Sequence, residues 1–147
     1  MKTPHFLIDD VNVGDRHVFR RFITAEDLRD MVRLTRDRGG YHVDERFAQA
    51  AGFRTVITPG LVQASMATKI GGDFNFLAQE ITFRYLKPVY AGDELEAVVE
   101  ITAVERERRR ITLETAISNQ HGEIVLTSTA RGFLPKAEWG IPDKEGG

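Results

Sequence analysis

Residues 37–68 read DRGGYHVDERFAQAAGFRTVITPGLVQASMAT, and we expect the rest of the chain to be organised around this stretch. It opens with a carboxylate and an imidazole, Asp37 and His42. The glycine pair between them predicts a turn and not a regular helix. The stretch closes on Pro59 and Gly60 and a run of small and apolar residues, which predicts the start of a buried helix. An acid and a histidine in one tight loop, beside a glycine at a helix N-terminus, can supply acid/base groups and an amide that stabilises an anion.

The composition sets limits on the class of protein. The 147 residues are expected to form one domain, 1–147, in which 135–147 is a loosely ordered tail. A net charge of −2 gives no bias toward nucleic acid or an anionic membrane, so we expect neither as a partner. The chain has no cysteine for a disulfide or thiolate site, and no His/Asp/Glu set has metal-ligand spacing. No apolar run has the length of a signal peptide or membrane span, so we expect a cytoplasmic protein.

Two short helices are predicted before residue 52. Thr24, with Asp27 three residues later, predicts a capping box and a helix that runs to about residue 35. The residues expected to face the core at helical spacing are Leu28, Met31, Val32 and Thr35. Asp44 is placed to cap a second helix that ends at Gly52. The predicted inner face of this second helix consists of Phe47, Ala48 and Ala51.

From residue 79 onward the hydrophobic period is two, which predicts strands. Together with an earlier candidate at 17–22, the strand segments are about 79–86, 95–101, 111–117 and 123–134. Short turns join the later strands, so we expect an antiparallel meander.

A helix from residue 60 to about 70, rich in small residues and ended by Gly71-Gly72, has to be covered by this sheet. The α+β layout is that of a single hot-dog domain, in which an antiparallel sheet wraps around a central helix. A single layer leaves its edges open, so we expect a homodimer or an oligomer built from dimers.

Three segments resemble the MaoC-like dehydratases, the hot-dog family that includes the (R)-specific enoyl-CoA hydratases. DRGGYH at 37–42 stands where that family has Asp-x-Asn-Pro-x-His, with the acid and the histidine at the family spacing. ITPGL at 57–61 stands where it has a His-Gly pair before the central helix. FRYLKPVYAGD at 83–93 resembles its Leu-Lys-Pro-Val-x-x-Gly-Asp signature. The resemblance runs from about Val13 to Leu134, with Gly39-Gly40 in place of Asn-Pro and Pro59 in place of the histidine.

The resemblance implies a hydro-lyase that adds water to a trans-2-enoyl thioester of coenzyme A or acyl-carrier protein, or removes it in reverse, without a cofactor or a metal. It assigns the proton transfers jointly to Asp37 and His42, and leaves open which group acts on water and which on C2. It assigns the oxyanion contact to the backbone N–H of Gly60, at the positive end of the central helix. It places the hydroxyl of Thr68 near the catalytic pair, as a substrate-binding group.

Other interpretations of the same residues stay open. An acid and a histidine in a loop can simply close that loop by hydrogen bonding. Hot-dog folds also host acyl-CoA thioesterases, and fold alone does not decide function. The Gly39-Gly40 departure keeps a non-catalytic, acyl-binding subunit in view. The basic run at 106–110 can bind coenzyme A phosphates, but a solvated hairpin tip is the favoured interpretation.

Overall fold

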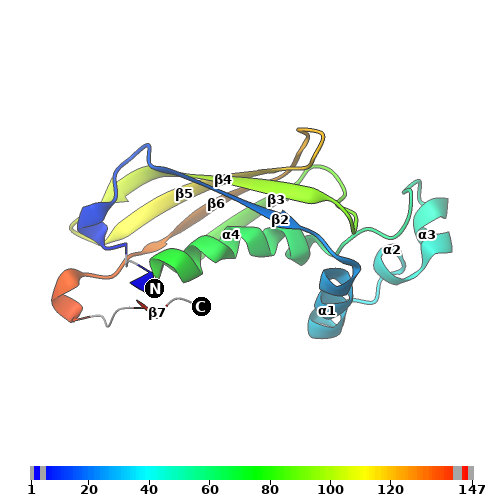
Figure 1. The fold of residues 1–147 in the computed structure, drawn as a ribbon, viewed down its shortest axis with the longest axis horizontal. Helices are drawn as coiled ribbons and strands as arrows, with labels where there is room; N and C mark the ends of the chain where they lie inside the picture. The colour runs from blue at the N-terminus through cyan, green and yellow to red at the C-terminus, as the bar shows by residue number, and fades with distance from the viewer. Residues whose placement is uncertain (1, 4–5, 141–143, 146–147) are drawn as a thin grey trace.

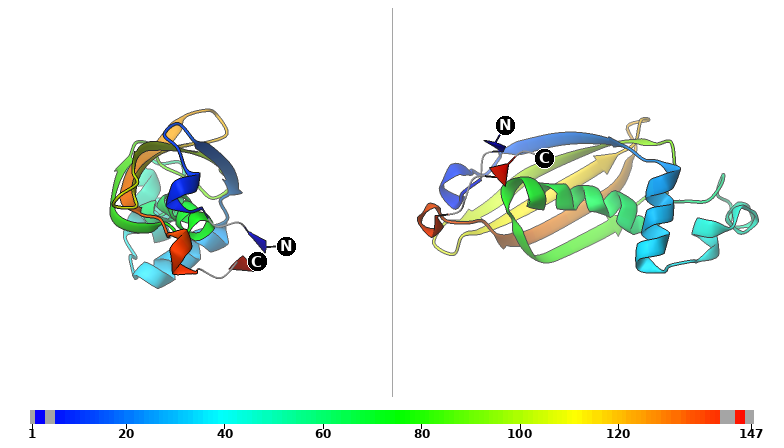
Figure 2. Two further views of the ribbon diagram at one scale, coloured as in Figure 1. Left: turned by 90° about the vertical axis from the view of Figure 1, so that its left-hand side faces the viewer. Right: turned by 60° about the horizontal axis from the view of Figure 1, so that its bottom comes forward.

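The computed structural model describes residues 2–3, 6–140 and 144–145. It has the predicted hot-dog architecture, a five-stranded antiparallel sheet curled around one long helix (Figures 1 and 2). The sheet strands are β2 (Arg16–Phe22), β3 (Leu77–Tyr85), β4 (Glu94–Glu105), β5 (Arg110–Ser118) and β6 (Ile124–Phe133). The helices are α1 (Ala25–Thr35), α2 (Gly40–Val43), α3 (Glu45–Ala50) and α4 (Gly60–Phe74), with 3-10 turns η1 (Ile8–Asp10) and η2 (Ala137–Trp139). Two short segments, β1 (Lys2–Thr3) and β7 (Lys144–Glu145), pair antiparallel.

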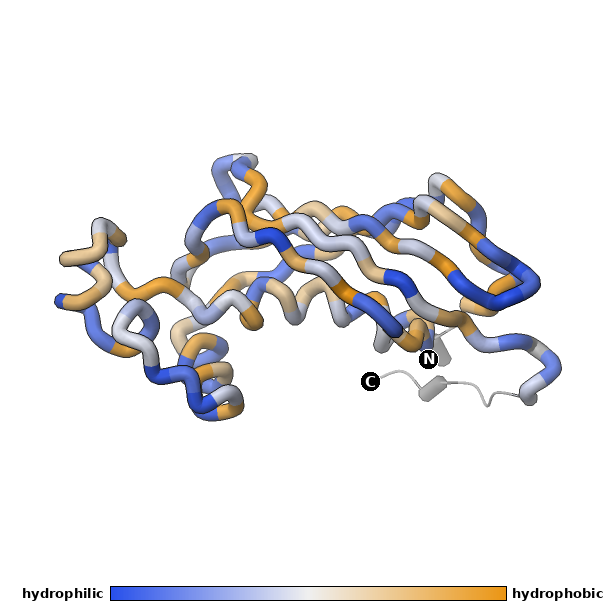
Figure 3. The backbone as a smooth tube through the Cα atoms, turned by 180° about the vertical axis from the view of Figure 1, so that it is seen from behind, coloured by the Kyte–Doolittle hydropathy of each residue, from blue (hydrophilic) through white to orange (hydrophobic). Residues whose placement is uncertain are grey.

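The sheet order is β2-β4-β5-β6-β3, so β2 and β3 are its edges. The two-residue period predicted for the central strands is confirmed by their burial. Leu95, Ala97, Val99 and Ile101 of β4 are at most 1% exposed, and their neighbours point outward. Figure 3 shows the same alternation of apolar and polar residues along the strands. The inner face of the sheet therefore forms the core, and its outer face carries polar side chains.

Helix α4 lies along the inner, concave face of the sheet and packs against it (Figure 2). Val62, Met66, Ile70 and Phe74, at helical spacing, are at most 3% exposed. The prediction that Gly71-Gly72 ends this helix was wrong, because α4 continues to Phe74 and ends at Asn75, whose φ is 54°. Burial of Phe74 in the core outweighs the helix penalty of about 1 kcal/mol for each glycine.

Helix α1 begins with the predicted capping box. The Thr24 hydroxyl accepts from the Asp27 N–H at 3.0 Å, and the Asp27 carboxylate accepts from the Thr24 N–H at 2.9 Å. Leu28 and Val32 are buried as predicted. Thr35 is exposed and does not face the core, because its hydroxyl donates to the Met31 carbonyl at the helix end.

The segment between Asp37 and Asp44 corrects the prediction of a turn without a helix. Gly39 is an extended N-cap, and residues 40–43 form the one-turn helix α2. Asp44 caps α3 as predicted, by accepting from the N–H groups of Arg46 and Phe47. Of the predicted inner face of α3, Ala48 is fully buried, whereas Phe47 and Ala51 are exposed. Phe47 instead packs sideways against Gly40, where the lack of a side chain gives its ring room.

The described part of the C-terminal tail is held at two places. The guanidinium of Arg109 lies 4.2 Å from the centre of the Trp139 ring, and β7 pairs with β1. Residues 141–143 and 146–147 of the predicted loose tail lie outside the described residues. In the described part of the chain, no helix is both long and apolar enough to cross a membrane.

Candidate active site

A cleft of about 480 Å³ lies at the N-terminus of α4 and brings together three separate parts of the sequence. His42 comes from α2, Gly60 and Leu61 from the first turn of α4, and Tyr85 with Leu86 from the end of β3. Its volume is within the usual range for a small-molecule site. Most of its wall is apolar, which suits a hydrophobic acyl group.

His42 is held in one orientation by the segment that leads into α4. Its Nδ1 lies 2.8 Å from the carbonyl oxygen of Ile57. A carbonyl oxygen can only accept, so Nδ1 carries the proton and the neutral ring has its lone pair on Nε2. The side chain is only 15% exposed, and it lines the cleft. The ring therefore presents a proton acceptor to the cleft.

Asp37 is not one of the residues that line the cleft, but it stands beside this acceptor. Its Oδ2 lies 3.7 Å from Nε2 of His42, and its Oδ1 accepts from the N–H of Gly39 at 3.1 Å. The Asp37 side chain is 55% exposed, so it is open to water. The structure thus brings the two predicted groups together, with two acceptor atoms close enough for one water beside them to donate a hydrogen to each.

Gly60 is the first residue of α4, and its N–H has no acceptor among the described residues. The first N–H groups of a helix are unpaired and carry the positive end of the helix dipole. A Cβ at this position would stand 2.6 Å from Cε1 and 3.0 Å from the hydroxyl oxygen of Tyr85. The Tyr85 ring therefore packs directly on Gly60 and forms one wall of the cleft. Partial burial raises the pKa of the Tyr85 hydroxyl above its ordinary value.

Thr68 is not part of this cleft. It lies on an exposed face of α4, two turns after Gly60, and its hydroxyl donates to the Ser65 carbonyl at 2.7 Å. Within one subunit it does not approach the Asp37–His42 pair, so its substrate-binding role stays a prediction.

Two buried polar residues of the cleft were missed from the sequence. Thr58 and Gln63 are each 3% exposed, and the Thr58 hydroxyl donates to Oε1 of Gln63 at 2.9 Å. Both residues line the cleft beside Gly60. The sequence signal that could have indicated Gln63 was its spacing, because positions 60 and 63 lie on the same face of a helix.

The basic run at 106–110 forms the turn between β4 and β5, and Arg106, Glu107 and Arg108 are exposed at this tip. The Arg106 guanidinium donates to the carbonyls of Ile8 and Val11, and the Arg109 guanidinium donates to the Leu134 carbonyl. These contacts fix the ends of the chain against the β4–β5 hairpin, at the end of the sheet opposite α2 (Figure 1). The predicted solvated hairpin tip is confirmed, and its Arg106 and Arg109 side chains also bind carbonyl groups of neighbouring segments.

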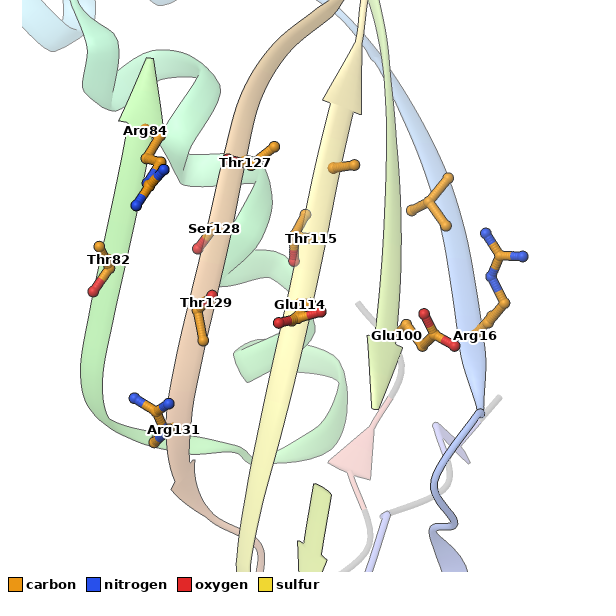
Figure 4. A pocket seen from close by; sticks show the side chains of 12 residues that line it. Arg16, Thr82, Arg84, Glu100, Glu114, Thr115, Thr127, Ser128, Thr129 and Arg131 are labelled. Carbon is orange, nitrogen blue, oxygen red and sulfur yellow. The ribbon is translucent and has the colours of Figure 1, made fainter. Parts of the chain in front are cut away.

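A second hollow, of about 740 Å³, lies on the face of the sheet away from α4 (Figure 4). Its side chains include Arg84, Glu114 and Arg131. Charged side chains and threonine hydroxyls line it together with a similar amount of apolar surface, and none of the predicted site residues lines it. Among the described residues, no group of three or more His, Asp or Glu side chains could hold a metal ion.

Comparison with known proteins places these features in a family. The family model described as "MaoC like domain" matches residues 14–122. The chain is 32% identical over 140 residues to a 3-hydroxybutyryl-CoA dehydratase from Methylorubrum extorquens, covering 91% of this chain and 87% of that protein. It is 29% identical to an (R)-specific enoyl-CoA hydratase from Aeromonas caviae, covering 85% and 96%. A solved (R)-hydratase structure from A. caviae superposes with a TM-score of 0.78 at 27% identity, covering 85% of this chain and 98% of the other.

Proposed function

This chain belongs to the MaoC-like domain family, and we propose that it is a hydro-lyase that adds water to a trans-2-enoyl thioester and removes it in the reverse direction. The relatives named as a 3-hydroxybutyryl-CoA dehydratase and an (R)-specific enoyl-CoA hydratase support this reaction type. The observation that carries the proposal is the pair formed by Asp37 and His42, whose facing atoms lie 3.7 Å apart and whose histidine lines a mostly apolar cleft.

The pair would hold and activate the attacking water. Oδ2 of Asp37 and the lone pair on Nε2 of His42 are both acceptors, so one water can donate a hydrogen to each. The water oxygen then attacks C3 of the enoyl group, and the proton it loses passes to the pair. The pair delivers a proton to C2, which completes the 3-hydroxyacyl thioester.

The negative charge that develops on the thioester oxygen would be stabilised at the start of α4. The N–H of Gly60 has no acceptor in the described residues and lies in the same cleft as His42. A preorganised donor of this kind, at the positive end of a helix dipole, acts mainly on the transition state.

We also propose a homodimer, or an oligomer built from dimers, in the cytoplasm, with a thioester of coenzyme A or acyl-carrier protein as substrate. Strand β3 is a sheet edge, and large apolar side chains at its end and on α4 are about half exposed. These side chains include Leu61, Tyr85 and Leu86 at the mouth of the cleft. A second subunit on this surface would cover them. Light scattering at micromolar concentration should report a dimer or a multiple of it, and a monomer alone would contradict this part of the proposal.

The reaction is tested with a panel of enoyl-CoA thioesters of different chain length. Loss of the enoyl absorbance, with free thiol measured in parallel, separates the two chemistries that hot-dog folds support. Hydration removes the enoyl absorbance without releasing thiol. Release of coenzyme A at the same rate would instead show a thioesterase, and binding without either change would show a non-catalytic acyl-binding subunit.

A further inference from the structure

Gln63 is a buried amide whose role is not explained by packing. It lies on α4 three residues after Gly60, so the two share one face of the helix. It is 3% exposed in a cleft whose wall is otherwise mostly apolar. A buried amide costs free energy unless its polar atoms are paired, so such a residue in this place calls for a partner.

One half of the amide has that partner. Oε1 of Gln63 accepts the Thr58 hydroxyl at 2.9 Å, and Thr58 is itself 3% exposed. Long side chains on a helix point back toward its N-terminus, and Thr58 precedes the first turn of α4. The bond therefore fixes the amide beside the start of the helix, where Gly60 lies.

The other half faces the cleft. Nε2 of Gln63 has no acceptor in the part of the chain that the structure describes. This nitrogen is not fully buried either. Among the described residues, the one side-chain nitrogen or oxygen that is both fully buried and unpaired is Nε of Arg110. Since Gln63 lines the cleft, its free N–H groups are reached from there.

We propose that Nε2 of Gln63 is a second oxyanion donor, which acts with the N–H of Gly60 on the thioester oxygen. This rests on the proposed hydratase function and adds a catalytic residue to it. Gly60 supplies a donor fixed by the backbone, and Gln63 supplies one fixed by Thr58. A donor held in advance on a rigid element has little reorganisation to undergo when charge develops on the substrate oxygen.

The first test replaces the donor and keeps the shape of the side chain. Gln63→Met removes the amide, and Gln63→Glu keeps the oxygen that Thr58 binds but turns Nε2 into an oxygen. Loss of one oxyanion donor typically lowers kcat by about 10²–10³-fold, and we expect a fall of about 10²-fold with little change in KM. Gln49→Met, the same change at an exposed position of helix α3, is the matched control and should keep wild-type kinetics.

The second test uses pH. A Gln63→Glu carboxyl group in this buried place is expected to have a raised pKa, and its protonated form has an O–H that can donate to the thioester oxygen. The ratio of Gln63→Glu activity to wild-type activity should therefore rise as the pH falls from about 8 to about 5. Because an ionised carboxylate in this place also costs stability, activity is expressed per folded protein, from circular dichroism at each pH. A residue that only supported the fold would leave that corrected ratio flat.

The third test reads the polarisation of the substrate directly. Bound hexadienoyl-CoA absorbs at longer wavelength when its carbonyl oxygen accepts strong hydrogen bonds, because the excited state carries more charge on that oxygen. In an Asp37→Asn background, which slows turnover, the red shift should be smaller when Gln63→Met is added. Circular dichroism shows whether each variant is folded.

The outcomes separate this inference from the function on which it rests. A wild-type protein that hydrates no enoyl thioester refutes the proposed function. A protein that hydrates, but whose folded Gln63→Met variant keeps most of its kcat and the full red shift, refutes the second donor alone. If Gln63→Met does not fold, a Gln63→Glu variant with a pH-independent ratio to wild type overturns the inference by itself.

Discussion

Gly40 and Phe47 are predicted to be complementary, so that a side chain at position 40 is tolerated only when the ring at position 47 is removed. A Cβ at Gly40 would stand 2.5 to 2.8 Å from three atoms of the Phe47 ring. An ordinary carbon–carbon contact is about 3.5–4.0 Å, so either the ring or the helix turn has to move by about 1 Å.

The size of the effect follows from two opposing contributions. Gly→Ala at an unstrained helical position stabilises by about 0.4–1 kcal/mol, because the unfolded chain loses freedom. Overpacking costs about 1–3 kcal/mol. Gly40→Ala should therefore destabilise by about 1 kcal/mol in the wild-type protein, and stabilise by about 0.4–1 kcal/mol in a Phe47→Ala background.

The assay is a double-mutant cycle of Gly40→Ala and Phe47→Ala, with free energies of unfolding from urea titrations. The coupling energy should be about 1–3 kcal/mol. Because His42 shares the one-turn helix α2 with Gly40, the activity of Gly40→Ala should also fall, and Phe47→Ala should restore part of it. If Gly40→Ala stabilises the protein while Phe47 is present, the contact does not explain why this chain has glycine here.

Two further predictions concern the start of α4 and the cap of α1. Gly60→Ala places a methyl group where the Tyr85 ring stands, so it should lower kcat/KM by about 10-fold or more. Stability should change little, because the half-exposed ring can rotate outward. Unchanged kinetics on an enoyl-CoA would contradict the close contact at this wall. Burial pushes the pKa of Asp27 up, but hydrogen bonds from Thr24 and Arg21 and the charge of Arg21 outweigh it and leave that pKa lowered. The stabilisation from the ionised Asp27 is thus present above the unfolded pKa of about 3.9 and is lost as the pH falls through the lowered folded value. In urea titrations, Asp27→Asn should therefore lose less stability than wild type between about pH 5 and pH 2. An identical pH dependence of the two proteins would refute this role of Asp27.

The parts of the fold that were predicted correctly depend on short-range patterns. The alternation from Leu95 to Ile101 places every second side chain on one face whatever the neighbouring strands are, and burial followed it. The Thr24 capping box is closed within four residues, so the sequence contains all of it. The order of one long helix followed by several antiparallel strands then allows few arrangements that bury the apolar faces of both the helix and the sheet.

The parts that were missed depend on contacts between distant residues. Gly71-Gly72 is a good helix end by itself, but the core around Phe74 keeps the chain helical. The one-turn helix that begins at Gly40 packs against the ring of Phe47, and the local helix or turn preference of residues 37–44 does not reveal that contact. The Thr58–Gln63 pair was missed because two ordinary polar residues show their burial only after the cleft has formed.

The central claim is that Asp37 and His42 act as one acid/base pair, and Asp37→Asn tests it most directly. An asparagine oxygen can still accept from the Gly39 N–H, so the loop should keep its shape while the carboxylate is lost. Asp44→Asn is the matched control, since asparagine caps a helix as well as aspartate does.

The measurement is the specificity constant of each folded variant on the best enoyl-CoA substrate. Asp37→Asn should lower it by about 10²–10⁴-fold, with a similar loss for His42→Ala and little further loss in the double variant, because groups that act as a unit are not additive. Asp44→Asn should stay near wild type. A folded Asp37→Asn protein that keeps most of its activity would contradict the account.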